Sequence, residues 1–267
     1  MAVLNMKKVS VVVPAFGDTP FLTACKAALE AQTFRDFEVI VCGEGSGNAG
    51  AARNVGLGRV SGEWVAFVDA DDLPCPDMLA AAVETGESGN ADIVVFAADE
   101  FDDKTGFKTR LPLKLGAGLD DAVRFTSFGN AVWNKLFRAA YLRAHGIRFQ
   151  EIARSNDLAF TVEALANTDR IAVLPRVLYR YRINAGGLQS TKAASPDCWR
   201  AALAECRLRL GRAGLLPRFE SALLALEREV EWDNLPGGCF SPRRIFHSIH
   251  RRGLGGFLLH AIGRLFR

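Results

Sequence analysis

The sequence lacks a long hydrophobic run and has little excess charge of either sign. Its 267 residues carry a formal net charge of only +3, so the composition as a whole does not indicate a nucleic-acid-binding protein. No apolar stretch approaches the length needed to span a bilayer, and residues 1–8 lack the apolar segment of a secretory signal. We therefore expect a cytoplasmic protein that is neither secreted by that route nor integral to a membrane.

Closely spaced cysteine pairs are also missing. The six cysteines are scattered along the chain, without the spacing that binds zinc or supports redox exchange. In a cytoplasmic protein we expect all of them to be reduced. Because 49% of the residues are hydrophobic, the chain can bury a sizeable core without disulfides.

Strand-like and helix-like segments alternate through about the first hundred residues. Apolar and β-branched runs predict strands, and apolar residues at helical spacing predict the helices between them. The predicted strands are 9–13, 37–42, 64–68 and 92–97, and the predicted helices are 20–32, 49–60 and 78–85. Alternation with short connections indicates an α/β fold with a mostly parallel, doubly wound sheet and helices on both faces.

The pattern changes beyond residue 100. A polar stretch over 101–118 predicts a hairpin or loop, and further helices and short strands follow it. The predicted helices are 120–128, 139–145 and 158–166, and the predicted strands are 171–174 and 177–182. Residues 195–232 read as a helical C-terminal region.

Residues 241–267 form a basic amphipathic tail. The tail has six arginines, three histidines and no acidic residue, with apolar residues at helical spacing. Helices of this kind bind anionic membrane surfaces, so we expect peripheral contact with the inner face of the plasma membrane. The alternative is that the apolar stripe packs on the main domain and the arginines are solvated.

Three carboxylates follow the predicted strand 64–68 at the point where it should end. Asp69, Asp71 and Asp72 would repel one another unless something positive neutralises them. Mg²⁺ and Mn²⁺ prefer oxygen ligands, and ligands of open α/β sheets bind at the carboxyl ends of strands. The D-x-D pattern therefore suggests a site for a metal-bound diphosphate, with a solvated acidic loop as the alternative.

A glycine-rich turn after the second predicted strand favours a different ligand. Residues 45–50 satisfy G-x-G-x-x-G, and Asp69 follows at a suitable distance, so an NAD-dependent oxidoreductase is an alternative. Three features oppose it. A full strand–helix unit precedes the motif, and Arg53 and Asn54 stand where close helix–sheet packing prefers small apolar residues. Asp69 is also joined by Asp71 and Asp72, whereas recognition of a ribose needs only one acid.

Several segments in a fixed order resemble the family 2 glycosyltransferases, inverting enzymes of the GT-A fold that use nucleotide-sugar donors. The matching segments are 9–16, 32–33, 37–46, 52–56 and 62–72, with looser matches at 133–137, 156–158 and 179–182. The resemblance implies a GT-A-like domain over 1–194, with a nucleotide-sugar-binding half (1–100) and an acceptor half (101–194). A helical extension (195–240) and the tail follow.

The resemblance also implies roles for individual residues. Asp71 would hold Mn²⁺ or Mg²⁺ on the donor diphosphate, with Asp72 behind it, and Asp69 would bind the ribose. Arg53 would reach the base or the phosphates, and Phe16 would stack on the base. The residues implied to bind the donor nucleotide are Pro14, Ala15, Phe16, Glu44, Ser46, Arg53 and Asp69.

A carboxylate in the second half is implied to be the catalytic base. Asp157 occupies the position that matches the family's base, and its alternative role is to cap the helix that follows. The positions implied to face the acceptor or the diphosphate are Asp72, Asn134, Lys135 and Arg182. For Lys135 a solvated surface lysine is the alternative.

The sequence departs from the family pattern at four positions. Gly43, Asn48 and Asn156 stand where the family usually has acids, and Glu44 is one methylene longer than the usual aspartate. The changes at 43, 44 and 48 weaken the assignment of uracil as the base. Those at 43–44 and 156 leave a non-catalytic binding or scaffold protein as an alternative. The function that the resemblance implies is bacterial and metal-dependent: inverting transfer from a UDP-sugar to a glycan or lipid-linked glycan in cell-surface polysaccharide synthesis.

Overall fold

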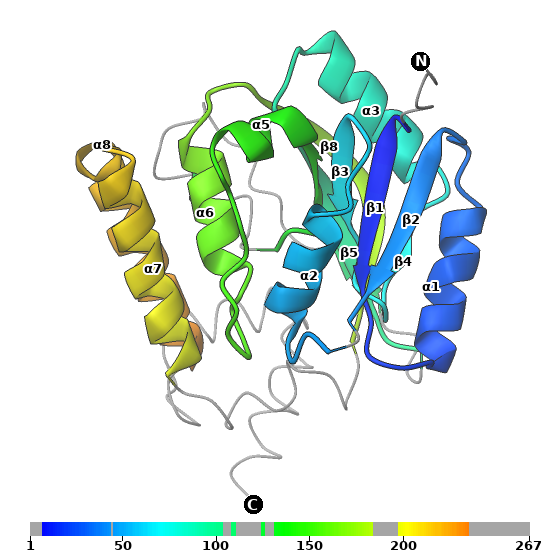
Figure 1. Ribbon diagram of the computed structural model, residues 1–267, viewed down its shortest axis with the longest axis horizontal. Helices are drawn as coiled ribbons and strands as arrows, with labels where there is room; N and C mark the ends of the chain where they lie inside the picture. The colour runs from blue at the N-terminus through cyan, green and yellow to red at the C-terminus, as the bar shows by residue number, and fades with distance from the viewer. Residues whose placement is uncertain are drawn as a thin grey trace, which may run out of the picture. The chain divides into compact units, whose positions relative to one another are not determined.

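The computed structural model describes residues 7–43, 45–103, 108–110, 124–125, 131–183 and 197–234 (Figure 1). The chain divides into two compact units, residues 1–229 and 230–267, and the architecture below belongs to the first. The helix predicted over 120–128 lies outside the described residues except at 124–125, and the tail 241–267 lies wholly outside them.

An eight-stranded sheet forms the centre of the first unit. Its strands are β1 (Val9–Pro14), β2 (Phe37–Cys42), β3 (Trp64–Phe67), β4 (Leu73–Pro74), β5 (Ile93–Phe101), β6 (Lys108–Arg110), β7 (Lys135–Arg138) and β8 (Ile171–Arg182). They lie in the order β2-β1-β3-β7-β5-β8-β4, and β6 pairs with β5.

The sheet is mixed. Strand β1 pairs in parallel with β2 and β3, as predicted, and β5 pairs in parallel with β8. Strand β7 lies antiparallel between β3 and β5, and β4 lies antiparallel to β8. The α/β prediction is confirmed, but the sheet is less parallel than expected, because β7 and β4 are too short to show a periodic pattern in the sequence.

The helices follow the sequence prediction closely. They are α1 (Pro20–Glu30), α2 (Ala49–Leu57), α3 (Met78–Ser88), α5 (Ala139–Ala144), α6 (Leu158–Ala166), α7 (Cys198–Arg212) and α8 (Leu216–Asn234). The segment predicted as helical over 195–232 is thus two helices. The strands predicted at 171–174 and 177–182 are one strand, β8, whose register against β5 shifts near Ala97.

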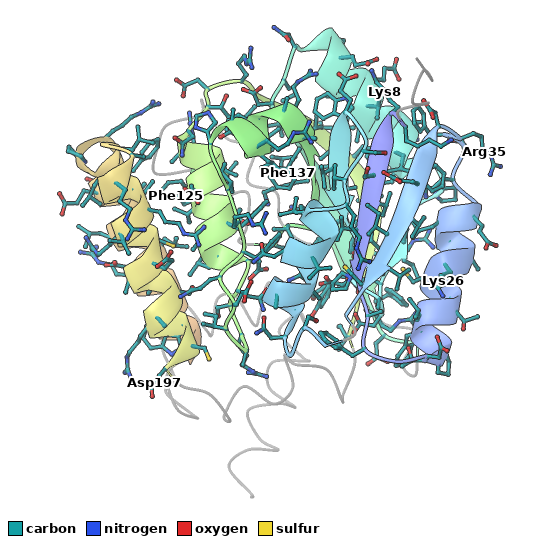
Figure 2. All side chains as sticks on the ribbon, viewed as in Figure 1. Lys8, Lys26, Arg35, Phe125, Phe137 and Asp197 are labelled. Carbon is teal, nitrogen blue, oxygen red and sulfur yellow. The ribbon has the colours of Figure 1, made fainter. Side chains whose placement is uncertain are left out.

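Helices cover both faces of the sheet. On one face, Val9, Val11 and Val13 of β1 join a buried cluster with residues of α1 and α3. On the other face, Gly56 of α2 lies against Val12. The ring of Phe67 on β3 packs edge-on against Phe160 of α6, with centroids 5.5 Å apart. Phe137 of β7 is buried in the middle of the molecule, whereas Lys26 of α1 is exposed (Figure 2). Among the described residues, no helix combines the length and the apolar character needed to cross a bilayer.

Candidate active site

Three loops meet at one edge of the sheet. Strands β1, β2 and β3 run in parallel, so their carboxyl ends lie together, where ligands of open α/β sheets bind. Pro14 ends β1, Ser46 follows β2, and Asp69 follows β3. Phe16 is 54% exposed at this edge, so its ring is accessible to a planar base. Glu44 lies outside the described residues.

Position 43 has room only for glycine, because it packs closely against the loop that follows β1. A Cβ atom at this position would lie 1.8 Å from the carbonyl oxygen of Ala15. The N–H of Ala15 donates to the carbonyl of Cys42 at 2.8 Å, and the hydroxyl of Ser46 donates to the carbonyl of Gly43 at 2.7 Å. The missing acid at position 43 therefore has a steric cause.

The loop at residues 69–72 is held by β8. Asp72 is fully buried, and its carboxylate accepts hydrogen bonds from the Tyr179 hydroxyl at 2.8 Å and from the Arg182 N–H at 2.7 Å. The Tyr179 hydroxyl also accepts the N–H of Asp69 at 3.0 Å, and Arg182 Nε donates to the carbonyl of Asp71 at 2.6 Å. The loop is therefore fixed from both its backbone and its side chains.

Two aspartates of this loop, Asp71 and Asp72, have a raised pKa. Burial is the main cause of the raised pKa of Asp71, and the charge of Asp69 adds to it. Burial, then Asp69 and Asp71, raise the pKa of Asp72 well above its ordinary value. A cation would offset this repulsion, so the carboxylates fit Mg²⁺ or Mn²⁺.

Asp71 is the ligand that the sequence proposes for that cation. Among the described residues, no cluster of three or more His, Cys, Asp or Glu side chains is arranged to hold a metal ion. Mg²⁺ is commonly bound through one or two carboxylates together with substrate phosphates, which is compatible with Asp71 as a single protein ligand.

Arg53 lies inside the protein. Its side chain is 7% exposed, and Nη2 donates to Oδ1 of Asp69 at 2.5 Å. Nη1 donates to Oδ1 of Asn156 at 2.7 Å. Its guanidinium thus bridges two protein segments, and its predicted contact with the base or the phosphates of the donor stays a prediction.

Asp157 stands next to this bridge at the start of α6. Its side chain makes no capping hydrogen bond to the helix, so the structure gives no support to the capping alternative. Burial raises the pKa of Asp157, and Asp69 adds to the rise, while the positive charges of Arg53 and Lys135 oppose it. A half-buried carboxylate with a raised pKa is suited to accept a proton.

Lys135 is buried and is not a solvated surface lysine. Its Nζ donates to the carbonyl of Ala131 at 2.6 Å and to Oδ1 of Asn134 at 2.8 Å. Burial lowers the pKa of Lys135 to about 7, opposed by the charge of Asp157. The neighbouring ring of Trp133 stacks on Tyr179, with centroids 4.8 Å apart. Trp133 thus contacts β8, while the charges of Lys135 and Asp157 act on each other.

The sequence analysis did not assign Tyr179 or Asn156 to the site. Both lie in segments that carry the family resemblance, which was the available signal. Their partners Asp72 and Arg53 are 107 and 103 residues away in the chain, so only the folded structure shows the contacts.

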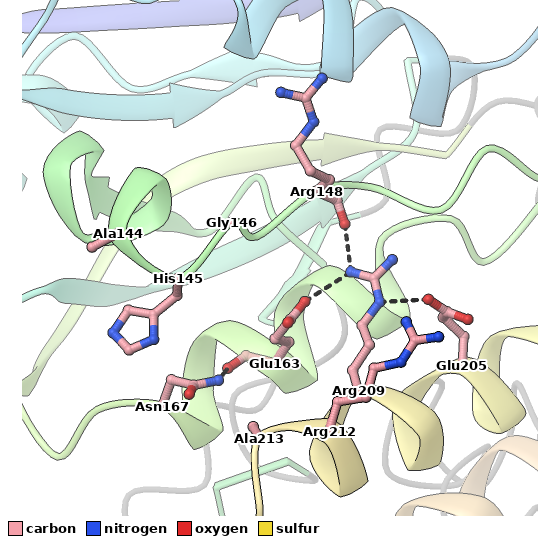
Figure 3. Close-up of a pocket in the computed structure, with 10 residues that line it drawn as sticks. All are labelled: Ala144, His145, Gly146, Arg148, Glu163, Asn167, Glu205, Arg209, Arg212 and Ala213. Carbon is pink, nitrogen blue, oxygen red and sulfur yellow. Dashed lines mark hydrogen bonds and ion pairs between the residues drawn. The ribbon is translucent and has the colours of Figure 1, made fainter.

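A separate hollow of about 640 Å³ lies between α5, α6 and α7 (Figure 3). Arg209 crosses it, donating to Glu163 and Glu205 at 2.8 Å each and to the carbonyl of Arg148 at 2.6 Å. The hollow contains none of the residues that the sequence assigns to donor, metal or base.

The mixed sheet with a carboxylate loop at its edge is a GT-A-like fold. The structure of S. aureus TarS with UDP-GlcNAc has a TM-score of 0.73, at 22% identity, covering 94% of this chain and 80% of that one. The mannosyltransferase PcManGT from Pyrobaculum calidifontis, with GDP-Man and Mn²⁺, has a TM-score of 0.58, at 17% identity, covering 97% and 80%. At these identities the likeness shows the fold.

Residues 43–146 match the model of glycosyl transferase family 2. The uncharacterized glycosyltransferase EpsJ of Bacillus subtilis is 26% identical over 216 residues, covering 67% of this chain and 62% of EpsJ. The succinoglycan biosynthesis protein ExoO of Rhizobium meliloti is 33% identical over 150 residues, covering 52% of this chain and 43% of ExoO. The chain thus spans less than two thirds of these relatives.

The family match includes the glycine-rich turn at 45–50, so the dinucleotide-binding alternative is wrong. The structure shows what the last glycine does. A Cβ on Gly50 would lie 2.2 Å from the carbonyl oxygen of Gln150 and 2.9 Å from Cβ of Asn156. Gly50 therefore lets α2 approach the segment that carries Asp157.

Proposed function

We propose that this protein is a metal-dependent, inverting glycosyltransferase that uses a nucleotide sugar, with UDP as the expected nucleotide. The observation that carries the proposal is the placement of two acidic groups. The 69–72 loop lies at the carboxyl edge of β3, and Asp157 lies across Arg53 from Asp69. One group suits a diphosphate and its cation, and the other suits an acceptor hydroxyl.

The 69–72 loop is the basis of the proposed donor site. A divalent cation held by Asp71 would neutralise the charge that develops on the leaving nucleoside diphosphate. Phe16 stacks on the base, while Ser46 and the backbone of Pro14 and Ala15 line the base side. Asp69 accepts hydrogen bonds from the ribose hydroxyls, and its ion pair with Arg53 holds the carboxylate in place.

Asp157 is the basis of the proposed transfer step. The Asp157 carboxylate takes the proton of the acceptor hydroxyl as that oxygen attacks the anomeric carbon. The bond from the anomeric carbon to the diphosphate breaks in the same displacement, so the configuration at this carbon inverts. Asn134, Lys135 and Arg182 lie on the side where the acceptor or the diphosphate approaches.

The acceptor class is proposed from the relatives. ExoO is a succinoglycan biosynthesis protein, and TarS is a poly(ribitol-phosphate) β-N-acetylglucosaminyltransferase, 26% identical to this chain over 227 residues. Both support a hydroxyl of a cell-surface glycan or lipid-linked glycan as the acceptor. The basic tail 241–267 would bring the site to the inner membrane face, where such precursors are assembled.

A thermal-shift screen of nucleoside diphosphates, with and without Mn²⁺ and alongside NAD, tests the donor site. A ligand that binds only the folded state raises the melting temperature. We expect one nucleoside diphosphate to stabilise the protein in the presence of Mn²⁺, and Asp71→Ala to abolish the effect. Asp36→Ala, which removes an exposed acid, is the control and should respond like the native chain.

Two outcomes would contradict the proposal. Stabilisation by NAD without metal would show a dinucleotide site, against the family match. Absence of a response to every nucleoside diphosphate would favour the alternative of a non-catalytic binding or scaffold protein.

A further inference from the structure

Helix α2 and the segment that carries Asp157 are joined by three neighbouring residues of the helix. Gly50 permits contact with the backbone of Gln150. Asn54 makes hydrogen bonds in both directions, from Nδ2 to the carbonyl of Phe149 at 3.0 Å and from the Phe149 N–H to Oδ1 at 2.9 Å. Arg53 adds the bond to Asn156. One face of α2 thus holds residues 149–156.

The turn before Asp157 needs such support. Ser155 has a φ of 54°, a left-handed conformation that side chains other than glycine and asparagine rarely adopt. Strained residues persist where the surrounding contacts hold them in place. The carbonyl of Asn156 accepts the N–H of Gln150 at 3.3 Å, and its Oδ1 accepts from Arg53.

The same guanidinium also holds the donor side. Nη2 of Arg53 pairs with Asp69, and the ring of Phe149 lies 5.4 Å from its central carbon. Its Nε is buried with no hydrogen-bond partner among the described residues. The two Nη bonds therefore account for its orientation, and they join residues that follow β3 to residues that precede α6.

We propose that Arg53 is a positioning residue that fixes the Asn156-Asp157 turn relative to Asp69, and so couples the donor half of the site to the acceptor half. The inference deepens the proposed function, since it assumes that Asp157 is the base. In this role Arg53 acts through Asn156 and Asp69.

Amide hydrogen exchange of the ligand-free protein tests the positioning directly. Because charge-assisted hydrogen bonds are among the stronger ones, Arg53→Met should raise exchange over 150–157 by about tenfold or more. Arg138→Met is the matched control. Arg138, at the end of β7, also pairs with an acid, Glu63, and lies over the ring of Trp64. These contacts are at the start of β3. Arg138→Met should leave 150–157 unchanged.

The pH profile of transfer separates positioning from mere stability. The charged groups facing Asp157 are Arg53 from α2, Asp69 from the loop after β3, and Lys135 from β7. Loss of the Arg53 charge raises the proton affinity of Asp157, so the acid limb should move to higher pH in Arg53→Met. Arg53→Lys retains the charge and should restore the limb, with a lower kcat because one ammonium cannot reproduce the two-pronged contact.

Unchanged exchange over 150–157 in Arg53→Met, or an acid limb that stays in place, would overturn the inference. Raised exchange in a protein that transfers no sugar from any nucleotide sugar would support the positioning and contradict the proposed function. The two failures are therefore distinguishable.

Discussion

At the scale of single residues, the site is built from charges buried beside selected partners. Arg53 pairs with Asp69, Asp72 accepts two hydrogen bonds, and Lys135 donates to two oxygens. Buried charges need such partners, because an unpaired one carries a large desolvation cost. Single substitutions here should therefore have large and specific effects.

Asp157→Asn should abolish transfer and leave donor binding intact. The amide keeps the size of the side chain but cannot accept the proton, and general bases typically contribute on the order of 10²–10⁴-fold. Single-turnover assays with a nucleotide sugar, together with the UDP thermal shift, measure both properties. Undiminished turnover would remove Asp157 from the mechanism.

The acid limb of the native pH profile should lie above the ordinary range of aspartate. The folded protein raises the pKa of Asp157, chiefly by burial, so the active carboxylate form is lost as pH falls through that raised value. The unperturbed value is about 3.9. A profile of kcat/KM measured with donor at saturation checks this, and a limb at or below the unperturbed value would contradict it.

Replacing Gly43 by aspartate, the acid usual in the family, should destabilise the protein. The new Cβ would meet the carbonyl oxygen of Ala15 at 1.8 Å, which forces the two loops apart. Overpacking of this kind costs about 1–3 kcal/mol. Urea denaturation measures the loss, and Gly43→Ala should show most of it, because the clash begins at Cβ. A stable Gly43→Asp would refute the steric explanation.

At the scale of elements, α2 determines how the two halves of the site are joined. Asn48 caps the helix, its Oδ1 accepting the N–H of Ala51 at 3.0 Å. Asn48 stands where the family usually has an acid, and an amide oxygen caps about as well as a carboxylate. The departure at position 48 therefore preserves the helix start, and with it the placement of Arg53.

Asn48→Ala should cost about 1 kcal/mol of stability and also weaken donor binding. Thr19→Ala is the matched control, because Thr19 caps α1 through the N–H of Leu22 at 3.1 Å but α1 carries no residue assigned to the site. Both variants should lose similar stability in urea titrations. Equal UDP affinities in the two would show that the start of α2 does not govern the donor site.

At the scale of the whole molecule, the described core contains the residues proposed for the donor site and the base, but not the tail proposed for membrane contact. The core belongs to residues 1–229, and the basic tail lies in the unit from 230 onward, outside the described residues. The membrane contact of the tail stays a prediction from charge and periodicity.

Removing residues 241–267 should release the protein from anionic vesicles. Six arginines without an acidic residue bind anionic lipid at about 1 kcal/mol each near the surface. Sedimentation with vesicles of anionic and of zwitterionic lipid, for the native and truncated chains, measures the effect. Continued sedimentation of the truncated chain with anionic vesicles would show that the tail is not the membrane contact.

The sequence by itself determined the strands β1, β2, β3 and β5 and the helices between them. Their apolar periodicity is local, and each repeats over enough residues to be recognised. It also determined the edge at which the acidic loop lies, because consecutive parallel strands end together. Strand β7 was missed, because its four residues, Lys135–Arg138, begin and end with a cation.

Only the tertiary structure decided how the acidic and basic residues pair. The bond from Arg53 to Asn156 spans 103 residues, and that from Tyr179 to Asp72 spans 107. Likewise the glycine at position 43 is explained by a carbonyl oxygen in another loop. Periodicity describes which face of an element is buried, whereas the partner of a buried charge depends on which distant segments the fold brings within hydrogen-bond reach.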